Sequence, residues 1–168
     1  MVKEIILASK SGVRKKILEE NNIQFRVEPS NVDEDSVKES LLKEKATSTI
    51  ISKNLAELKA NKISQKFTEE IVLGADSVID LDGEIISKPN DREEALEILK
   101  RMNGKTHQLI SSVCISRGGS MIWNYTDKAS LTMKNMTFFE LENYLKKVSD
   151  KDLYAYNVYQ IEIGRAHV

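Results

Sequence analysis

The stretch LASKSGVRKKIL, residues 7–18, joins an apolar strand to an amphipathic helix. The pattern predicts a buried strand over residues 3–8 and a helix over residues 11–21 with Ile17 and Leu18 turned inward. Backbone N–H groups at a helix N-terminus have no partner within the helix, and the helix dipole adds positive potential there. The serines and basic residues of this junction therefore favour binding of an anion such as phosphate. Taken alone, such a junction is more often a plain Ser11 cap beside solvated basic residues.

Strand and helix patterns alternate along the rest of the chain. Further strands are predicted at residues 23–27, 71–79, 84–87, 106–117, 120–133 and 154–161, and further helices at residues 36–62, 91–103 and 137–148. Asp82-Gly83 and Gly118-Gly119 are typical of hairpin turns. Glu94 can complete a capping box at the start of its helix, as can Glu140. Gly104 suits a left-handed helix end. This order predicts a single α/β domain with a long mixed sheet flanked by helices.

Composition excludes several classes of protein. The chain has 168 residues, 40% of them hydrophobic and 30% charged, with a net charge of -1. The absence of a basic excess argues against nucleic acid as a partner. The sequence shows neither a long apolar span nor a signal-peptide pattern, which argues against a membrane protein. Cys114 is the single cysteine, which is typical of a reducing, cytoplasmic setting and of a buried structural thiol.

Acidic residues occur at two places that suit a metal ion. Asp33, Glu34 and Asp35 form a cluster in a polar stretch, and Asp76 follows a buried strand. A lone carboxylate in an apolar setting needs a partner, and carboxylate oxygens suit Mg²⁺ or Mn²⁺ when substrate phosphates complete the shell. The alternatives are a helix cap for the cluster and a turn position for Asp76.

Two lysines could add cations to such a site. Lys59 lies on the long predicted helix, and Lys88 precedes Pro89 after the hairpin. Either lysine could instead be an ordinary solvated surface residue. The combination of an anion-binding junction, two acidic sites and separated lysines matches a metal-assisted phosphate site without a Walker loop. The two histidines have neither metal-site nor triad spacing.

The order of the motifs resembles the Maf family of nucleoside triphosphate pyrophosphatases, from Ile5 to about Glu162. The matching stretches, in chain order, are LASKSGVRKKIL, VDED, LAELKA, GADSVIDLDGEIISKPND, DREEALEIL, GKTHQLISSV and YQIE. The resemblance implies an inosine triphosphatase-like α/β fold with an elongated nucleotide-binding cleft. It also implies hydrolysis between the α- and β-phosphates, which releases pyrophosphate and a nucleoside monophosphate.

The resemblance also assigns roles to individual residues. Asp76 matches the catalytic proton acceptor near the metal, and Glu34 matches the acid beside the metal. The positions that match the substrate-binding residues are Ser9, Ser11, Arg14, Lys59, Ser77, Lys88 and, near the base, Gln160. The implied cofactor is Mg²⁺ or Mn²⁺, the implied partner is a nucleoside triphosphate, and a homodimer is common in the family.

Some features depart from the family pattern. Val13 stands where the family often has an Arg linked to base choice, which leaves both dTTP or UTP and 7-methyl-GTP as candidate substrates. Residues 163–168, IGRAHV, match a translated sequencing adapter. We therefore expect a domain over residues 1–162 that natively continues past Glu162. The alternatives to general removal of unwanted nucleotides are turnover of a modified purine nucleotide and a non-catalytic nucleotide-binding role in cell division.

Overall fold

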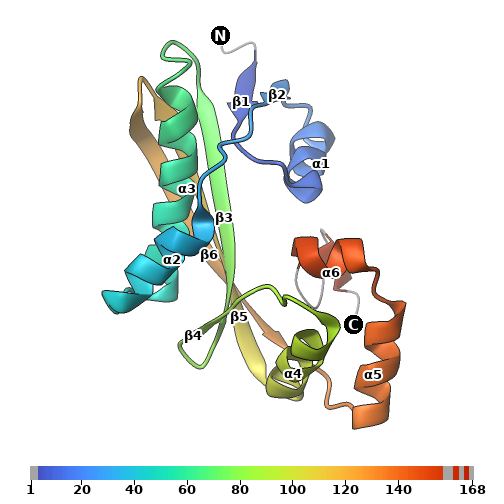
Figure 1. The fold of residues 1–168 in the computed structure, drawn as a ribbon. Helices are drawn as coiled ribbons and strands as arrows, with labels where there is room; N and C mark the ends of the chain where they lie inside the picture. The colour runs from blue at the N-terminus through green and yellow to red at the C-terminus, as the bar shows by residue number, and fades with distance from the viewer. Residues whose placement is uncertain (1–3, 157–160, 163–164, 167–168) are drawn as a thin grey trace. The chain divides into compact units, whose positions relative to one another are not determined.

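The computed structural model describes residues 4–156, 161–162 and 165–166 (Figure 1). The elements in chain order are β1 (Ile5–Leu7), α1 (Gly12–Glu20), β2 (Phe25–Val27), α2 (Glu34–Lys43), α3 (Ser48–Ser64), β3 (Val72–Leu81), β4 (Glu84–Ile86), α4 (Arg92–Met102), β5 (Thr106–Arg117), β6 (Ser120–Thr132), α5 (Phe138–Lys147), α6 (Asp150–Tyr156), β7 (Ile161–Glu162) and β8 (Arg165–Ala166). None of the helices in the described part of the chain is both long enough and apolar enough to cross a membrane.

The main sheet is mixed, as the sequence predicts. Its strand order is β2-β1-β3-β5-β6, with β4 paired to β3. β1 runs parallel to β2 and β3, with Ile6 opposite Val72, whereas β4 runs antiparallel to β3 through the predicted Asp82-Gly83 turn. Strands β5 and β6 flank Gly118 and Gly119, both of which have positive φ. The predicted α/β class and mixed sheet are therefore confirmed.

The chain divides into two compact units, each with its own core. The first comprises Met1–Ser77 and Ile110–Lys128, and the second comprises Val78–Leu109 and Ala129–Val168. The core of the first unit consists of Ile6, Ala8, Ala56, Ala60, Ile63, Val72 and Cys114. The core of the second unit contains apolar residues of β3, β4, α4, α5 and α6, including Leu99, Leu145 and Leu153. The predicted domain boundaries at residues 1–162 and 163–168 stay predictions.

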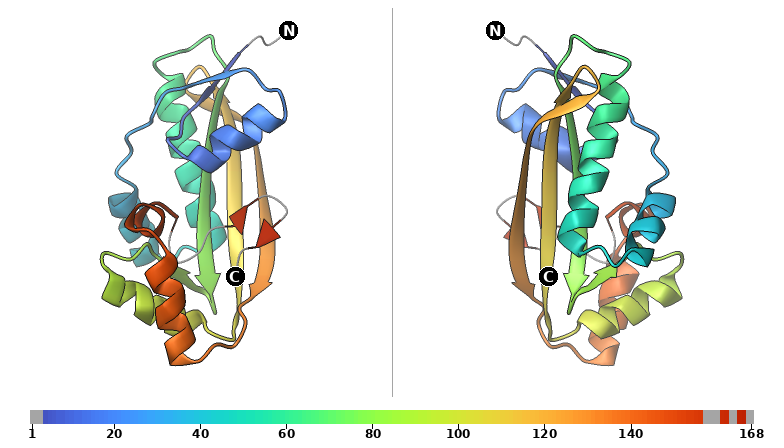
Figure 2. Two further views of the ribbon diagram at one scale, coloured as in Figure 1. Left: turned by 90° about the vertical axis from the view of Figure 1, so that its right-hand side faces the viewer. Right: turned by 90° about the vertical axis from the view of Figure 1, so that its left-hand side faces the viewer.

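Helix α3 packs unusually closely against β3 in the first unit. In both views of Figure 2, α3 runs alongside β3. Gly74 makes this approach possible, because a Cβ there would overlap the carbonyl oxygen of Ala56 and lie 2.8 Å from the backbone nitrogen of Ala60. Both neighbouring atoms belong to helix backbone and cannot rotate away. The glycine therefore sets the distance between the helix and the strand.

We expect Gly74→Ala to lower the free energy of unfolding by about 3 kcal/mol, since overpacking against rigid backbone forces the helix and strand apart. The matched control is Gly83→Ala, where an added Cβ meets nothing within 4 Å but φ is 87°. That variant carries only the backbone cost of about 1–2 kcal/mol. Chemical denaturation of both variants measures the difference, and an equal or smaller loss for Gly74→Ala would contradict close packing.

The predicted long helix over residues 36–62 is wrong, because the chain forms two helices there. Lys45 adopts a left-handed conformation with φ of 57°, and its N–H donates to the carbonyl of Leu42 while Ala46 N–H donates to that of Leu41. This pair of bonds is a Schellman helix end. Thr47 then caps α3 by accepting from Ile50 N–H at 3.3 Å. This helix end is hard to recognise in the sequence, because glycine is the residue usually found at the position of Lys45.

The predicted final strand over residues 154–161 is also wrong at its start. Residues up to Tyr156 belong to α6, and residues 157–160 lie outside the described part of the chain. Ser149 Oγ accepts from Asp152 N–H at 3.1 Å, and Leu153 is fully buried. The helix cap at Ser149 and the burial of Leu153 therefore determine the structure here, and the alternating pattern does not.

Two local predictions need correction, and three are confirmed. Ile17 is 37% exposed rather than inward, whereas Leu18 is buried as predicted. Glu94 reaches back to Asn90 N–H and not to the cap residue, so the box predicted there is incomplete. The capping box between Thr137 and Glu140 is complete, and Gly104 has the expected left-handed φ of 65°.

Candidate active site

The first part of the site lies at the start of α1. Ser11 is the N-cap, and its Oγ accepts from Arg14 N–H at 3.4 Å. Ser9 Oγ accepts from the Arg14 guanidinium at 2.9 Å and from Ser11 N–H at 3.2 Å. The structure therefore brings together three of the predicted residues. Ser11 does cap the helix, but Arg14 folds back over the junction instead of extending into solvent.

The second part is a cluster of three charged side chains, two of them buried. Asp76 on β3 is 4% exposed and Lys59 on α3 is 5% exposed. Lys59 Nζ lies 2.9 Å from Asp76 Oδ1 and 2.7 Å from Glu34 Oε1 at the start of α2. It also donates to the carbonyl of Ala75 at 3.3 Å. One ammonium thus joins two carboxylates that are far apart in sequence.

Local structure explains why these charges meet. Gly74 lets α3 approach β3, so that a lysine on the buried face of the helix reaches the carboxylate of Asp76. Ser52, on the same buried face, donates to the carbonyl of Asp76 at 3.1 Å. Asp33 caps α2 by accepting from Ser36 N–H, which fixes Glu34 as the first residue of that helix. The helix-cap interpretation of the acidic cluster is therefore correct for Asp33, while Glu34 belongs to the charged site.

Burial and the nearby lysines shift the pKa of Asp76 in opposite directions. Burial raises the pKa of this carboxyl, the positive charges of Lys59 and Lys38 lower it, and Glu34 raises it further. The net result is a raised pKa, which suits a group that accepts a proton during turnover.

Arg14 is electrostatically linked to the same acids. Burial lowers the pKa of its guanidinium, while the negative charges of Asp76 and Glu34 raise it. An arginine remains charged under these conditions. The helix junction and the acidic cluster therefore form one site with a forked cation at one side and two carboxylates at the other.

The donor set fits a magnesium-type ion. Asp76 Oδ2 is buried and has no hydrogen-bond partner among the described residues. Glu34 supplies a second carboxylate through the shared contact with Lys59. No group of three or more His, Cys, Asp or Glu suited to a metal was found in the described part of the chain. Mg²⁺ commonly takes only one or two carboxylates and completes its shell with water and substrate phosphates, so two acids are sufficient.

The remaining predicted site residues are Ser77, Lys88 and Gln160. Ser77 Oγ lies 3.0 Å from Ser111 Oγ in the same unit. Lys88 is exposed and belongs to the second unit, which is described separately. Gln160 lies outside the described residues. Sequence reasoning missed Lys38 and Ser111; the Glu34–Lys38 spacing of one helical turn is the signal that could have indicated the former.

We expect Lys38→Ala to shift the acid limb of the pH–rate profile to higher pH. Burial has already raised the pKa of Asp76, and Lys38 opposes that increase, so removal of its charge raises the pKa further. The proton-accepting form then appears only at higher pH. The measurement is kcat/KM against pH, with Lys43→Ala on the exposed end of α2 as the control. An acid limb that stays in place for Lys38→Ala would show that this lysine does not act on Asp76.

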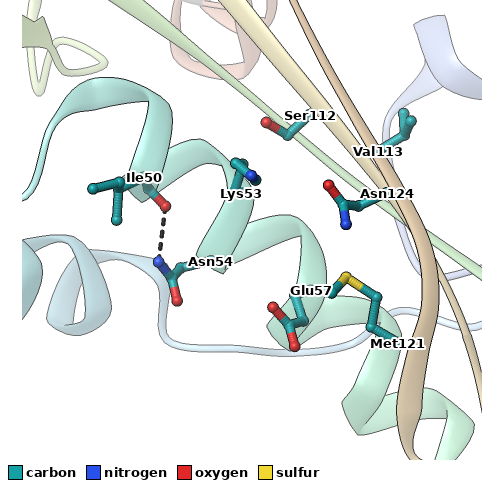
Figure 3. A pocket seen from close by; sticks show the side chains of 8 residues that line it. All are labelled: Ile50, Lys53, Asn54, Glu57, Ser112, Val113, Met121 and Asn124. Atoms are coloured by element: carbon teal, nitrogen blue, oxygen red, sulfur yellow. Dashed lines mark hydrogen bonds between the residues drawn. The ribbon is translucent and has the colours of Figure 1, made fainter.

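A separate pocket is lined by residues of α3, β5 and β6 (Figure 3). It has a volume of about 280 Å³ and is lined by Ile50, Lys53, Asn54, Glu57, Ser112, Val113, Met121 and Asn124. Asn54 donates to the carbonyl of Ile50 at 2.9 Å and so is held against its own helix. Neither Lys59 nor Asp76 lines this pocket, which is therefore distinct from the charged site.

Fold and site together define a class: an α/β protein with a serine-capped helix N-terminus and a carboxylate–ammonium–carboxylate cluster in one compact unit. The chain belongs to the Maf-like protein family, whose model matches residues 4–165. It is similar, with 96% identity over 162 residues, to a nucleoside triphosphate pyrophosphatase of Pelagibacter ubique (strain HTCC1062). That match covers 96% of this chain and 83% of the relative.

More distant relatives carry two different names. A nucleoside triphosphate pyrophosphatase of Ruegeria sp. (strain TM1040) is 39% identical, and a 7-methyl-GTP pyrophosphatase of Brucella suis biovar 1 (strain 1330) is 35% identical. Each match covers 96% of this chain and 81% of the relative. A dITP/XTP pyrophosphatase structure from Mycobacterium abscessus aligns with a TM-score of 0.49 and 12% identity over 77% of this chain and 73% of that one, which adds nothing to the assignment.

Proposed function

We propose that this chain hydrolyses nucleoside triphosphates between the α- and β-phosphates to a nucleoside monophosphate and pyrophosphate. The observation that carries the proposal is the Asp76–Lys59–Glu34 cluster, whose Asp76 and Lys59 are buried and which is linked by charge to Arg14. Family membership and the name of the 96% identical relative support the same reaction. A binding module that does not turn over its nucleotide would have no use for two acids at a phosphate site, so the regulatory alternative is disfavoured.

Asp76 is the proposed proton acceptor. Water attacks a phosphorus of the α–β anhydride, its proton passes to Asp76, and the bond to the bridging oxygen breaks. The raised pKa of Asp76 supports this role because a stronger base takes the proton more readily. Asp76 and Glu34 would hold Mg²⁺ or Mn²⁺. Such an ion, when bound, supplies charge neutralisation on the phosphate oxygens.

The remaining residues bind and orient the substrate in this proposal. Arg14 and the hydroxyls of Ser9 and Ser11 hold phosphate oxygens at the N-terminus of α1, where free backbone N–H groups and the helix dipole favour anions. Ser77, beside the proton acceptor, and Lys88 contribute further polar contacts. Gln160 contacts the base. These assignments rest on the family resemblance and on the chemistry of the side chains.

The choice of base is the least constrained part of the proposal. Val13 lacks the charge that the family often carries at this position, so the pyrimidine triphosphates and 7-methyl-GTP remain the two candidate groups. We favour general nucleoside triphosphates, because the 96% identical relative carries that name and the 7-methyl-GTP relatives are at 35% identity or below. Removal of unwanted nucleotides, a cytoplasmic location and a homodimer belong to the same proposal.

The test is a panel of nucleotides in which pyrophosphate release is measured with Mg²⁺, with Mn²⁺ and with a chelator. The proposal expects metal-dependent release of pyrophosphate from dTTP or UTP at a higher kcat/KM than from 7-methyl-GTP. A reversed order would move the chain to the modified-purine alternative. Nucleotide binding without release from any member of the panel would contradict the enzyme assignment.

A further inference from the structure

The short polar contacts of Lys59 are all made within the protein. Its ammonium donates to the Ala75 carbonyl at 3.3 Å and to Asp76 Oδ1 at 2.9 Å, and it forms an ion pair with Glu34 Oε1 at 2.7 Å. The side chain is 6% exposed. The ammonium is therefore engaged by the protein and almost closed off from solvent.

The ammonium of Lys59 lies between two carboxylates. It lies within 3 Å of one oxygen from each of two carboxylates, as a bridging cation would. Asp76 is buried, whereas the side chain of Glu34 is 40% exposed. Two carboxylates this close to one ammonium need a counter-ion, because their mutual repulsion and the loss of hydration at Asp76 disfavour the charged forms. Asp76 Oδ2 has no partner among the described residues, so the lysine satisfies only part of the acceptor capacity of the pair.

We propose that Lys59 is a built-in substitute for the divalent cation: in the metal-free protein its ammonium occupies the position between Asp76 and Glu34, and a metal ion held by these two residues would displace it. This inference rests on the proposed metal-assisted function. It makes Lys59 a positioning residue that keeps the acids together before the metal arrives. The direct phosphate contacts then fall to Arg14 and the α1 junction.

The proposed role of Lys59 predicts that its ammonium weakens the binding of the metal. The metal ion and the ammonium compete for the same carboxylate oxygens, so each metal-binding event has to break the contacts of Lys59. Removal of the ammonium takes away the cation that lies between the two carboxylates, and the metal then binds without that competitor. A lysine that contacted only phosphate would have no such effect in the absence of nucleotide.

The experiment measures Mn²⁺ binding to the full chain without nucleotide, by the electron paramagnetic resonance signal of free Mn²⁺. We expect Lys59→Met to bind Mn²⁺ about tenfold more tightly than the unmodified protein, because one competing unit charge is lost. Lys53→Met, on the exposed face of the same helix, is the matched control and should leave the affinity unchanged. Unchanged or weaker binding by Lys59→Met, or no binding by any form, would overturn the proposal.

A second measurement needs no variant and so does not depend on the folding of Lys59→Met. Trace acetylation of the unmodified protein, read by mass spectrometry, reports how accessible each lysine is. Addition of Mn²⁺ should increase labelling of Lys59 relative to Lys53, and a constant ratio would overturn the proposal. Pyrophosphate release by the unmodified protein tests the proposed function separately, so that either idea can fail while the other stands.

Discussion

Asp76→Asn should reduce pyrophosphate release by a factor of about a hundred or more. The asparagine has nearly the same shape and still offers an oxygen to Lys59, so the α3–β3 contact keeps its hydrogen bond. What it loses is the negative charge and the ability to accept a proton. Because Asp76 is 4% exposed and its pKa is raised by burial, bulk solvent cannot readily substitute for it.

The measurements are kcat for pyrophosphate release and the melting temperature of the same preparation. Asp35→Asn is the matched control, since Asp35 is exposed in the first turn of α2, next to Glu34. We expect the control to retain full activity and both variants to remain folded. Turnover of Asp76→Asn within a few-fold of the unmodified protein would remove Asp76 from the proposed chemistry.

Arg14→Ala should raise KM for the nucleotide by about tenfold to a hundredfold, with a smaller effect on stability. The guanidinium is held at the α1 junction by Ser9 and is under the influence of both acids. A charge-assisted hydrogen bond contributes about 1.5–3 kcal/mol, and each 1.4 kcal/mol corresponds to a factor of ten in binding. The loss of one such contact to phosphate accounts for the expected increase.

Arg14→Lys and Lys16→Ala provide the comparison. The lysine retains the charge but not the planar fork, so Arg14→Lys should recover only part of the affinity. Lys16 lies on the exposed side of α1, where its ion pair with Glu20 measures 3.8 Å, and its removal should leave KM unchanged. An unchanged KM in Arg14→Ala together with a clear fall in melting temperature would make the arginine structural.

The sequence predicted the parts of this site that depend on local pattern. A carboxylate at the end of an apolar run identified Asp76, although the structure places it inside β3 and not after a strand. A serine before a basic helix identified Ser11. The joint contact of Lys59 with Asp76 and Glu34 could not be derived in the same way. It depends on how closely α3 approaches β3, and that distance is set by the missing side chain of Gly74.

The errors in the predicted fold have a similar origin. Helices α2 and α3 were predicted as one because Lys45 takes a left-handed conformation that few residues other than glycine and asparagine adopt. The start of α6 was predicted as a strand because alternation over a few residues says less than a cap at Ser149 and a fully buried Leu153. In both cases backbone hydrogen bonds at a helix end decided the structure, and the apolar pattern does not encode them.

The position of bond cleavage tests the central claim most directly. Two analogues of the most active nucleotide in the panel, with a methylene group in place of either the α–β or the β–γ bridging oxygen, are incubated with the protein and the metal, and the products are separated by chromatography. The account predicts that the β,γ-methylene analogue is cleaved to the nucleoside monophosphate and methylene bisphosphonate, while the α,β-methylene analogue stays intact. Release of inorganic phosphate from the α,β-methylene analogue, with the β,γ-methylene analogue untouched, would contradict it.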